Sequence, residues 1–407
     1  MIGQMRSKEA MVLAAIAALC ATMAMIMTHF FSPVQQVENM LDDLRVVTMS
    51  DSEPQNEDIV IATITEETLS LFPYRSPVNR EFLANLVRAL ESKGVKAIGI
   101  DILFDTPTDE ASDVMLFEAL NAAQVPIAVS YADSQQLNES QIEFINLFSQ
   151  NVHRGYANVV TNALDGVVRY VFPGRDNPST GEWTPGIAGA LAEIAGVEPP
   201  RELRRIVYRG LPEDAIGAEN PTFSTFKRYP AHTIHLLPDA WLKDKIVLVG
   251  AELTDIDLDL KRTPYAVQFG DRGGEIPGVM VHAHALAQIL EDRSFMTTPL
   301  WAEAILVLLV ALIGVALAKL EFPMWGFLGG AIAIVAGMWV GGFVVFAEGG
   351  PMAPLVAPTF AFIAAASLGL LYAGQSDREQ KRFIKDAFSR YLPPTLVDQL
   401  VDNPDLL

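Results

Sequence analysis

Three long apolar runs in the last third of the sequence constrain this chain more than any other feature. The runs follow one another with only short polar breaks, at Trp301–Ala318, Met324–Phe346 and Leu355–Tyr372. A helix of about 20 apolar residues is long enough to cross the ~30 Å hydrocarbon layer of a bilayer. We therefore expect three transmembrane helices within residues 299–374.

A fourth apolar run, Met11–Phe31, lies near the N-terminus and follows Arg6 and Lys8. A cleaved signal peptide also begins with positive charge before an apolar stretch, so it is the alternative interpretation. The run is long for a signal peptide, and no small-residue cleavage pattern closes it before Ser32. An uncleaved transmembrane helix over residues 11–31 is the favoured interpretation.

Basic residues predict the orientation of the four spans, because cytoplasmic loops carry an excess of Lys and Arg. They precede the first run, separate the second from the third, and follow the fourth: Arg6, Lys8, Lys319, Arg378, Lys381, Arg382 and Lys385. The turn at residues 347–354 holds Glu348 and no basic residue. We expect a multi-pass protein of the plasma (inner) membrane with both termini, residues 1–10 and 375–407, in the cytoplasm. Residues 32–298 then form one extracytoplasmic domain.

The composition limits the class of partner. Hydrophobic residues make up 50% of the chain, yet its formal net charge is −20. Both properties fit a chain whose apolar residues lie in the membrane and whose acidic residues lie in an aqueous domain. Without a basic stripe, nucleic acid is not an expected partner. The single cysteine, Cys20, excludes an intrachain disulfide and a cysteine-based zinc site.

The large domain alternates strand-like and helix-like segments, which predicts an α/β fold. Continuous apolar runs suit strands covered on both faces, and they occur at residues 59–64, 95–104, 127–131 and 245–250. Helical spacing predicts helices over residues 34–47, 80–93, 112–121, 184–195 and 279–290. The strand, helix, strand order over residues 59–104 predicts a βαβ unit with parallel pairing. Asp165-Gly166 predicts a β-hairpin turn. Loops are expected over residues 51–58 and 270–274, and a short strand over residues 205–208.

Aspartates follow two of the predicted core strands. Asp101 and Asp105 lie at the end of one, and Asp255 and Asp257 follow another. Ligands of open α/β sheets bind at the carboxyl ends of strands, and clustered carboxylates suit a hard cation such as calcium. The simpler alternative is that these acids cap helices and line solvated turns. An EF-hand is excluded, because Leu260 stands where its turn requires glycine.

Other motifs narrow the function to signalling. His282 and His284 lie two residues apart on a predicted helix, so they face different sides and cannot chelate together. One or both are expected to be packing or interface residues. The sequence has no nucleophile elbow, zinc-protease helix or kinase signature. The predicted spans hold almost no charge, whereas transporters usually place ionisable groups near the bilayer centre. The residues do not reveal the ligand of the external domain.

The segment after the last span predicts a cytoplasmic amphipathic helix. Phe383, Phe388 and Tyr391 recur on one face, and Pro393-Pro394 ends the helix. Such a helix beneath a membrane bundle needs a partner for its apolar face. A second copy of the chain is the simplest partner, so we expect a parallel homodimer.

Five segments, in this order, resemble the second class of CHASE sensor domains. They are Ile-Val-Ile-Ala-Thr-Ile (59–64), Gly-Val-Lys-Ala-Ile-Gly-Ile-Asp-Ile-Leu-Phe (94–104), Asp-Gly-Val-Val-Arg (165–169), Asp-Lys-Ile-Val-Leu-Val-Gly-Ala (244–251) and Pro-Gly-Val-Met-Val-His-Ala (277–283). The resemblance covers the external domain and the three spans that follow it. It implies a sensor that precedes a class III adenylate cyclase, a histidine kinase or a serine/threonine kinase.

The tail favours the cyclase. Residues 388–404 are similar to the segment that leads into class III adenylate cyclase domains. The resemblance implies a full-length protein that makes cyclic AMP from ATP, with magnesium or manganese in a catalytic domain that residues 1–407 do not include. No catalytic residue or cofactor is assigned to these residues. The expected signal-coupling residues are Phe383, Phe388, Arg390, Tyr391, Pro393 and Pro394. The alternatives are the sensor half of a histidine or serine/threonine kinase, and a non-enzymatic membrane receptor or scaffold.

Overall fold

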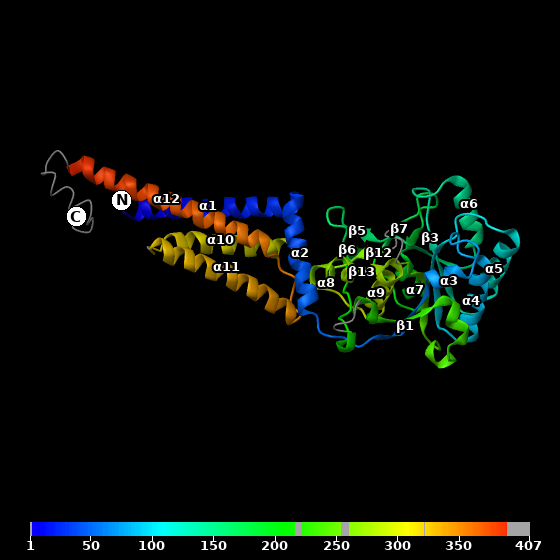
Figure 1. Cartoon of the computed structure of the whole chain (residues 1–407). Coiled ribbons are helices and arrows are strands. Elements are labelled where there is room, and N and C mark those ends of the chain that lie inside the picture. Colours follow the sequence, from blue (N-terminus) through cyan, green and yellow to red (C-terminus); the bar gives the residue numbers. More distant parts are fainter. Residues whose placement is uncertain (1, 216–220, 254–259, 321, 389–407) are drawn as a thin grey trace. The chain divides into compact units, whose positions relative to one another are not determined.

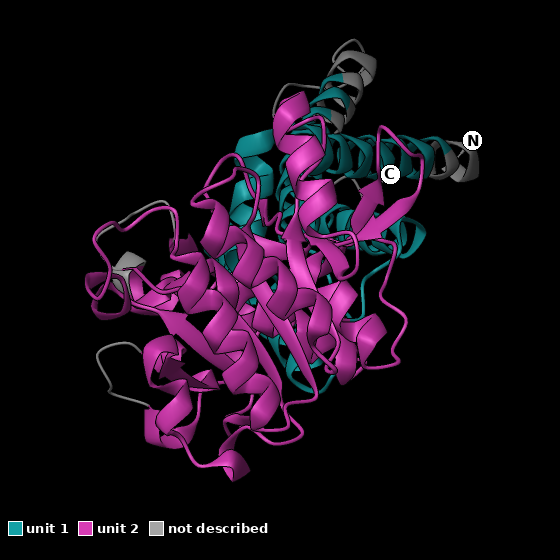
Figure 2. Cartoon of the chain, turned by 90° about the vertical axis from the view of Figure 1, so that its right-hand side faces the viewer, with its two compact units in different colours: residues 1–42, 296–407 teal, residues 43–295 magenta. Residues whose placement is uncertain are grey.

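The computed structural model describes residues 2–215, 221–253, 260–320 and 322–388 (Figure 1). The chain divides into two compact units, which Figure 2 shows in different colours. One unit contains residues 1–42 and 296–407, and its described elements are helical. The other contains residues 43–295 and holds all the described strands.

The α/β unit is built around a six-stranded, all-parallel sheet of order β10-β1-β11-β2-β3-β4. Its strands are β1 (Asn56–Ile64), β2 (Ala97–Leu103), β3 (Ile127–Tyr131), β4 (His153–Tyr156), β10 (Phe226–Pro230) and β11 (Ile246–Ala251). Parallel sheets are normally covered on both faces, which requires apolar residues on both sides of each strand. The continuous apolar runs supply them, so the predicted α/β fold is confirmed.

Helices cover both faces of this sheet. Alternate residues of β1 enter two different cores, because successive side chains of a strand point to opposite faces. Ile59 and Ile61 pack with α7 (Ile187–Ile194) and α9 (Gly278–Leu290). On the other face, Val60 and Ala62 pack with α4 (Arg80–Ser92) and α5 (Glu110–Ala122). The layers are therefore helix, sheet and helix.

The ends of these helices follow local sequence signals. The Asn79 side chain accepts a hydrogen bond from the Phe82 N–H at 2.8 Å and caps α4, the helix predicted over residues 80–93. Gly94 follows α4 with a φ of +68°, a conformation that glycine adopts without strain. Asp109 caps α5 by accepting a hydrogen bond from the Ser112 N–H.

The predicted strand, helix, strand pairing is wrong in one respect. β1 and β2 run parallel, but β11 lies between them and pairs with both. Ile246 is paired with Ile59 on one side and with Ala97 on the other. The sequence between β1 and β2 gives no sign that β11 pairs between them, because β11 lies far along the chain.

Three smaller antiparallel sheets complete the unit. They contain β5 (Val160–Thr161), β6 (Val168–Val171) and β9 (Arg204–Arg205), then β7 (Gly174–Asp176) with β8 (Trp183–Pro185), and β12 (Leu260–Arg262) with β13 (Glu275–Pro277). The predicted turn at Asp165-Gly166 joins β5 to β6, and Gly166 has a φ of +72°. Tyr156 precedes this hairpin and belongs to β4. Of the strand predicted over residues 205–208, only Arg205 lies in a strand, as the last residue of β9.

Several further elements differ from the prediction. Thr184 and Pro185 belong to β8, and α7 begins after Gly186, which provides no side-chain cap. Asn56 already belongs to β1, so the predicted loop is shorter. The glycines at residues 270–274 lie in a helix that is kinked at Gly270, not in a loop. The remaining helices are α3 (Glu66–Ser70), α6 (Glu139–Phe148), α8 (Ala266–Gly274), η1 (Glu213–Ala215), η2 (Pro221–Thr225), η3 (Ala231–Leu236) and η4 (Asp239–Trp241).

The helical unit confirms four apolar helices long enough to cross a membrane. The apolar stretches are Lys8–Phe30, Leu300–Ala318, Met324–Ala347 and Val356–Gln375. They lie in α1 (Ile2–Phe30), α10 (Leu300–Ala318), α11 (Met324–Ala347) and α12 (Val356–Phe388). A further helix, α2 (Ser32–Met49), follows α1 after a break at Phe31 and continues into the α/β unit.

Small residues let α10 and α12 approach closely. Ala311 on α10 is buried together with Ala361 and Ala365 on α12. A Cβ atom added to Gly314 would lie only 2.6 Å from the Phe362 carbonyl oxygen. Within a bilayer, such contacts between small residues are a main source of helix association.

The apolar part of α12 ends at Gln375, next to the span boundary predicted from the sequence. The helix itself continues past that point, because α12 is one helix of 33 residues from Val356 to Phe388. At 1.5 Å per residue it is roughly 50 Å long. A continuous helix can carry a displacement from one end to the other.

Candidate functional site

Asp101 and Asp105 lie at the carboxyl edge of the central sheet, as predicted, but each carboxylate has a different set of neighbours. Asp101 Oδ1 accepts a hydrogen bond from Ser130 Oγ at 3.1 Å, and Asp101 Oδ2 lies 3.9 Å from His282 Nε2. Asp105 instead accepts a hydrogen bond from Gln141 Nε2 at 2.5 Å. Both acids therefore already have protein partners.

The calcium hypothesis stays a prediction. Asp255 and Asp257 lie outside the described residues, so half of the expected ligand set has no described geometry. Across the described part of the chain, no three His, Cys, Asp or Glu side chains gather as metal ligands would.

Most of the predicted coupling residues also fall outside the described ranges. These are Arg390, Tyr391, Pro393 and Pro394. The backbones of Phe383 and Phe388 belong to the last turns of α12.

A buried charge cluster at the same sheet edge was not foreseen from the sequence. Asp133 follows β3 and is 1% exposed. It accepts hydrogen bonds from the Tyr156 hydroxyl at 2.6 Å and from Arg175 Nε and Nη2 at 3.0 and 2.7 Å. Burial raises the pKa of Asp133, but the hydrogen bonds from Tyr156 and the Gln135 N–H and the charge of Arg175 outweigh it and hold this pKa below its usual range. The Arg175 contact ties the β7–β8 hairpin to the sheet.

The hydrogen bond to Asp133 also affects the pKa of its donor, Tyr156. Burial, followed by the hydrogen bond to Asp133, raises the pKa of Tyr156 to about 12. The phenol therefore stays protonated and donates to the carboxylate at neutral pH. Asp133 and Arg175 lie 42 residues apart in the sequence, so no local motif indicates their contact.

The two histidines of α9 contact different neighbours, as their spacing predicts. His282 faces Asp101, whereas His284 is buried between the rings of Tyr208 and Phe226. The Arg209 N–H donates to His284 Nδ1 at 3.3 Å. Burial, then the positive charges of Arg209 and Arg293, lower the pKa of His284 to about 3. His284 is therefore a neutral packing residue.

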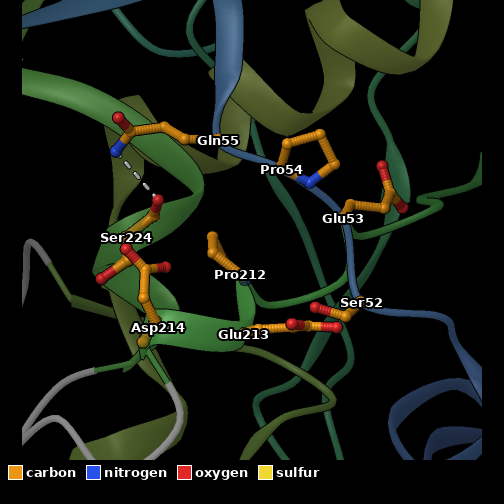
Figure 3. A pocket seen from close by; sticks show the side chains of 9 residues that line it. Ser52, Glu53, Pro54, Gln55, Pro212, Glu213, Asp214 and Ser224 are labelled. Carbon is orange, nitrogen blue, oxygen red and sulfur yellow. Dashed lines mark hydrogen bonds between the residues drawn. The ribbon is translucent and has the colours of Figure 1, made fainter.

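An open cavity of about 660 Å³ lies beside the segment that joins α2 to β1 (Figure 3). Its lining residues are Ser52, Glu53, Pro54, Gln55, Pro212, Glu213, Asp214, Ala215 and Ser224. Gln55 Nε2 donates to the Ser224 carbonyl oxygen at 3.0 Å across one wall, the dashed line of Figure 3. The volume is in the range of small-molecule sites. Three carboxyl groups in the lining favour a cationic ligand over an anionic one.

Glu53 connects this cavity to the segment that follows α9. Arg293 Nη1 and Nη2 donate to the two Glu53 oxygens at 3.0 and 2.7 Å, and Arg209 Nη2 lies 3.0 Å from Glu53 Oε2. The ion pairs join the chain just after α2 to the chain just after α9. A cation that bound Glu53 would compete with both arginines.

The end of α2 is held in the α/β unit by a buried ion-pair network. Asp43 is 1% exposed and accepts hydrogen bonds from Arg169 Nε and Nη2 at 2.8 and 2.6 Å and from Arg205 Nη2 at 2.9 Å. Arg169 also donates to Asp165 at 2.7 Å. Burial lowers the pKa of Arg169, but the two carboxylates outweigh it and raise that pKa. The segment Asp165–Arg169 is one of those that resemble CHASE sensors, and its first and last residues, Asp165 and Arg169, both belong to this network.

The other part of α2 contacts the start of α12 in the helical unit. The two oxygens of Glu38 accept hydrogen bonds from the N–H groups of Leu355 and Val356, each at 2.8 Å. Val34 and Leu41 of α2 pack against the side chains of the same two residues. The sequence offered no signal for this contact, because Glu38 and Leu355 are 317 residues apart.

Comparisons with known proteins identify the family. The CHASE2 domain family matches residues 17–316, most of the chain. No curated protein and no solved structure matches it. CHASE2 is an extracellular sensor domain of signalling proteins, in agreement with the resemblance of the five sequence segments. With an α/β domain, four apolar helices and a family match over most of its length, this chain belongs to the CHASE2 domain family.

Proposed function

We propose that residues 1–407 are the sensor and membrane-transducing part of a class III adenylate cyclase, which makes cyclic AMP from ATP in response to an extracytoplasmic signal. Membership of the CHASE2 family supports the sensor role. The observation that carries the output role is α12, which runs unbroken from the last apolar span to Phe388. Residues 388–404, which resemble the segment leading into cyclase domains, follow the described part of this helix in the sequence.

The output is tested with a chain that continues beyond residue 407 into the expected cyclase domain. Purified in detergent and supplied with ATP and magnesium or manganese, it should form cyclic AMP. Residues 1–407 alone should form none. A folded dimer of the longer chain without activity would sink the cyclase assignment.

The alternatives are the sensor half of a histidine or serine/threonine kinase, and a non-enzymatic receptor or scaffold. Reading the gene beyond codon 407 separates these possibilities. A cyclase coding sequence supports the proposal, a kinase coding sequence replaces it, and a stop codon favours the scaffold.

The proposed topology places both termini in the cytoplasm and the α/β unit outside the plasma (inner) membrane. The distribution of basic residues supports it. Because Cys20 is the only cysteine, single cysteines can be placed at Lys8 and at the exposed Glu213 in a Cys20→Ser background. A membrane-impermeant maleimide added to spheroplasts should label position 213 and not position 8. The reverse pattern would invert the topology.

A parallel homodimer is part of the proposal, because the resemblance to class III cyclases implies catalytic sites at a dimer interface. Native mass spectrometry of the 407-residue chain released from detergent should show the mass of two copies. Monomers at every protein concentration would contradict the dimer.

The extracytoplasmic ligand is proposed only as a chemical class. If Asp101, Asp105, Asp255 and Asp257 bind calcium, millimolar calcium should raise the melting temperature of the chain, because a ligand stabilises the state that binds it. The Asp255→Asn/Asp257→Asn double variant should lose this shift. A wild-type melting temperature that does not respond to calcium would remove the cation from the proposal.

A further inference from the structure

We propose that α2 couples the α/β sensor unit to the output helix α12. Asp43 holds α2 to the sensor unit, and Glu38, on the same helix, holds the first turn of α12. The inference rests on the proposed function, since it takes α12 as the helix that leads to the catalytic domain. The carboxylates of Asp43 and Glu38 then transmit the movement from the sensor unit to α12.

The sensor end of this connection is a buried ion pair that resists separation. Asp43 is bound by Arg169 and by Arg205, and all three side chains are at most 10% exposed. Removing one member of such a network leaves a buried charge without its partner, which is strongly unfavourable. A movement of the strands that carry the arginines, β6 and β9, must therefore move Asp43 as well.

The output end is a helix N-terminus in which Glu38 replaces the missing hydrogen-bond partners. The first N–H groups of a helix have no partner within the helix. Glu38 accepts from two of them at the start of α12, through Leu355 and Val356. Its negative charge also complements the positive end of the helix dipole. Charge-assisted hydrogen bonds of this kind are stronger than neutral ones, so Glu38 binds the N-terminus of α12 in a defined geometry.

The helix between the two carboxylates is suited to transmit a movement. α2 is unbroken from Ser32 to Met49, and it contains no glycine. Glu38 and Asp43 lie about 7.5 Å apart along its axis and on different faces, because five residues turn an α-helix by roughly 140° beyond one full turn. Each carboxylate can therefore hold its own partner, and a rotation or shift of α2 moves both.

The second covalent connection between the two units is less suited to this role. α9 and α10 are separated by residues 291–299, and none of these residues is helical. A rotation of α9 can be absorbed by the backbone of this segment. The α2 connection has no such interruption between Asp43 and Glu38.

Hydrogen exchange on the full 407-residue chain in detergent tests the coupling. Glu38→Gln should speed exchange of the Leu355 and Val356 amides by about tenfold, the equivalent of one lost hydrogen bond. Arg205→Gln weakens the network at the sensor end while Arg169 still holds Asp43. In the wild-type background, Arg205→Gln should change the exchange rates of the Leu355 and Val356 amides. In the Glu38→Gln background, adding Arg205→Gln should cause no further change in these rates.

Two control variants separate coupling from general loosening. Trp339→Phe removes a different side-chain hydrogen bond to the first turns of α12, from Trp339 Nε1 to Thr359 Oγ1, and the response to Arg205→Gln should persist. Arg175→Gln breaks a sensor ion pair that does not involve α2, and α12 should not respond. If Glu38→Gln loses the wild-type circular dichroism, Glu38→Asp takes its place, because its shorter side chain cannot reach both N–H groups.

The outcomes for the coupling and for the cyclase proposal are distinct. If Arg205→Gln leaves the α12 amides unchanged, or changes them equally with and without the Glu38 carboxylate, the coupling is wrong. In the longer chain, cyclic AMP formation with a rate insensitive to both variants would overturn the coupling and leave the cyclase standing. Coupled exchange without cyclic AMP formation would leave the coupling standing and overturn the cyclase.

Discussion

Arg169 binds both oxygens of Asp43 with its Nε and Nη2 groups, although the two residues are 126 positions apart in the sequence. Both side chains are nearly inaccessible to solvent, at 2% and 1% exposure. Burial of two charges costs desolvation energy that their attraction only partly repays, so the pair is not by itself a source of stability. Its effect is to fix one position of α2 against the small antiparallel sheet that holds β6.

Breaking this pair should destabilise the α/β unit. Arg169→Gln leaves Asp43 and Asp165 without their shared cation, so we expect a loss of about 3–5 kcal/mol in the free energy of unfolding. Denaturant titration of the full chain, followed by a signal from the α/β unit, measures it. Arg88→Gln, on the exposed face of α4, should change stability by less than about 0.5 kcal/mol. A similar small change for Arg169→Gln would refute the structural role of the pair.

His284 should make the stability depend on pH. Burial and two nearby arginines lower the pKa of His284 to about 3 in the folded protein, against a value near 6.5 when unfolded. Below pH ~6.5 the unfolded chain therefore binds a proton that the folded chain does not, and stability falls by up to ~1.4 kcal/mol per pH unit until about pH 3. The stability difference between wild type and His284→Asn, measured at pH 7 and pH 5, isolates this contribution. It should shrink at the lower pH; an unchanged difference would show that His284 titrates normally.

The contact between α10 and α12 predicts a position-specific effect of one methyl group. Gly314→Ala places a Cβ 2.6 Å from the Phe362 carbonyl oxygen, so the helices must separate, at an expected cost of about 1–3 kcal/mol. Gly337→Ala on α11 is the matched control, because a Cβ there would meet no atom within 4 Å. Thermal unfolding in detergent should separate the two variants. Equal melting temperatures would contradict the packing of α10 on α12.

Tyr156 should stabilise the sheet edge through its hydroxyl alone. Tyr156→Phe removes the 2.6 Å hydrogen bond to the buried Asp133 carboxylate, and we expect a loss of about 1.5–3 kcal/mol. Tyr74→Phe, at an exposed tyrosine, controls for removal of a hydroxyl. Chemical denaturation compares the two. No difference between them would mean that Arg175 alone satisfies Asp133.

Local elements were predictable, but their pairing was not. The strand at residues 127–131 and the helix that starts at residue 80 were confirmed, because strand and helix patterns depend on residues close together in the sequence. The insertion of β11 between β1 and β2 was missed, because a buried apolar strand can pair with any other strand of the same kind. α7 was predicted to begin at Thr184-Pro185, a good helix-start signal, but pairing with β7 takes those residues into β8 instead.

The candidate sites divide in the same way. Asp101 and Asp105 lie at the sheet edge where the strand pattern put them, yet their partners, Ser130, His282 and Gln141, come from other elements. Asp133 and Arg175 were missed altogether. An isolated aspartate after a strand reads as a turn residue until the fold brings an arginine to it.

The sequence by itself determined that this chain has four apolar helices, an α/β domain between the first and second, and family features of a CHASE2 sensor. These properties follow from hydropathy and periodicity, which act over short stretches of chain. Only the tertiary structure decided the strand order, the burial of Asp43 by Arg169, and the capping of α12 by Glu38. Each of these contacts is between residues that are distant in the sequence. Whether such residues meet depends on how the elements between them pack.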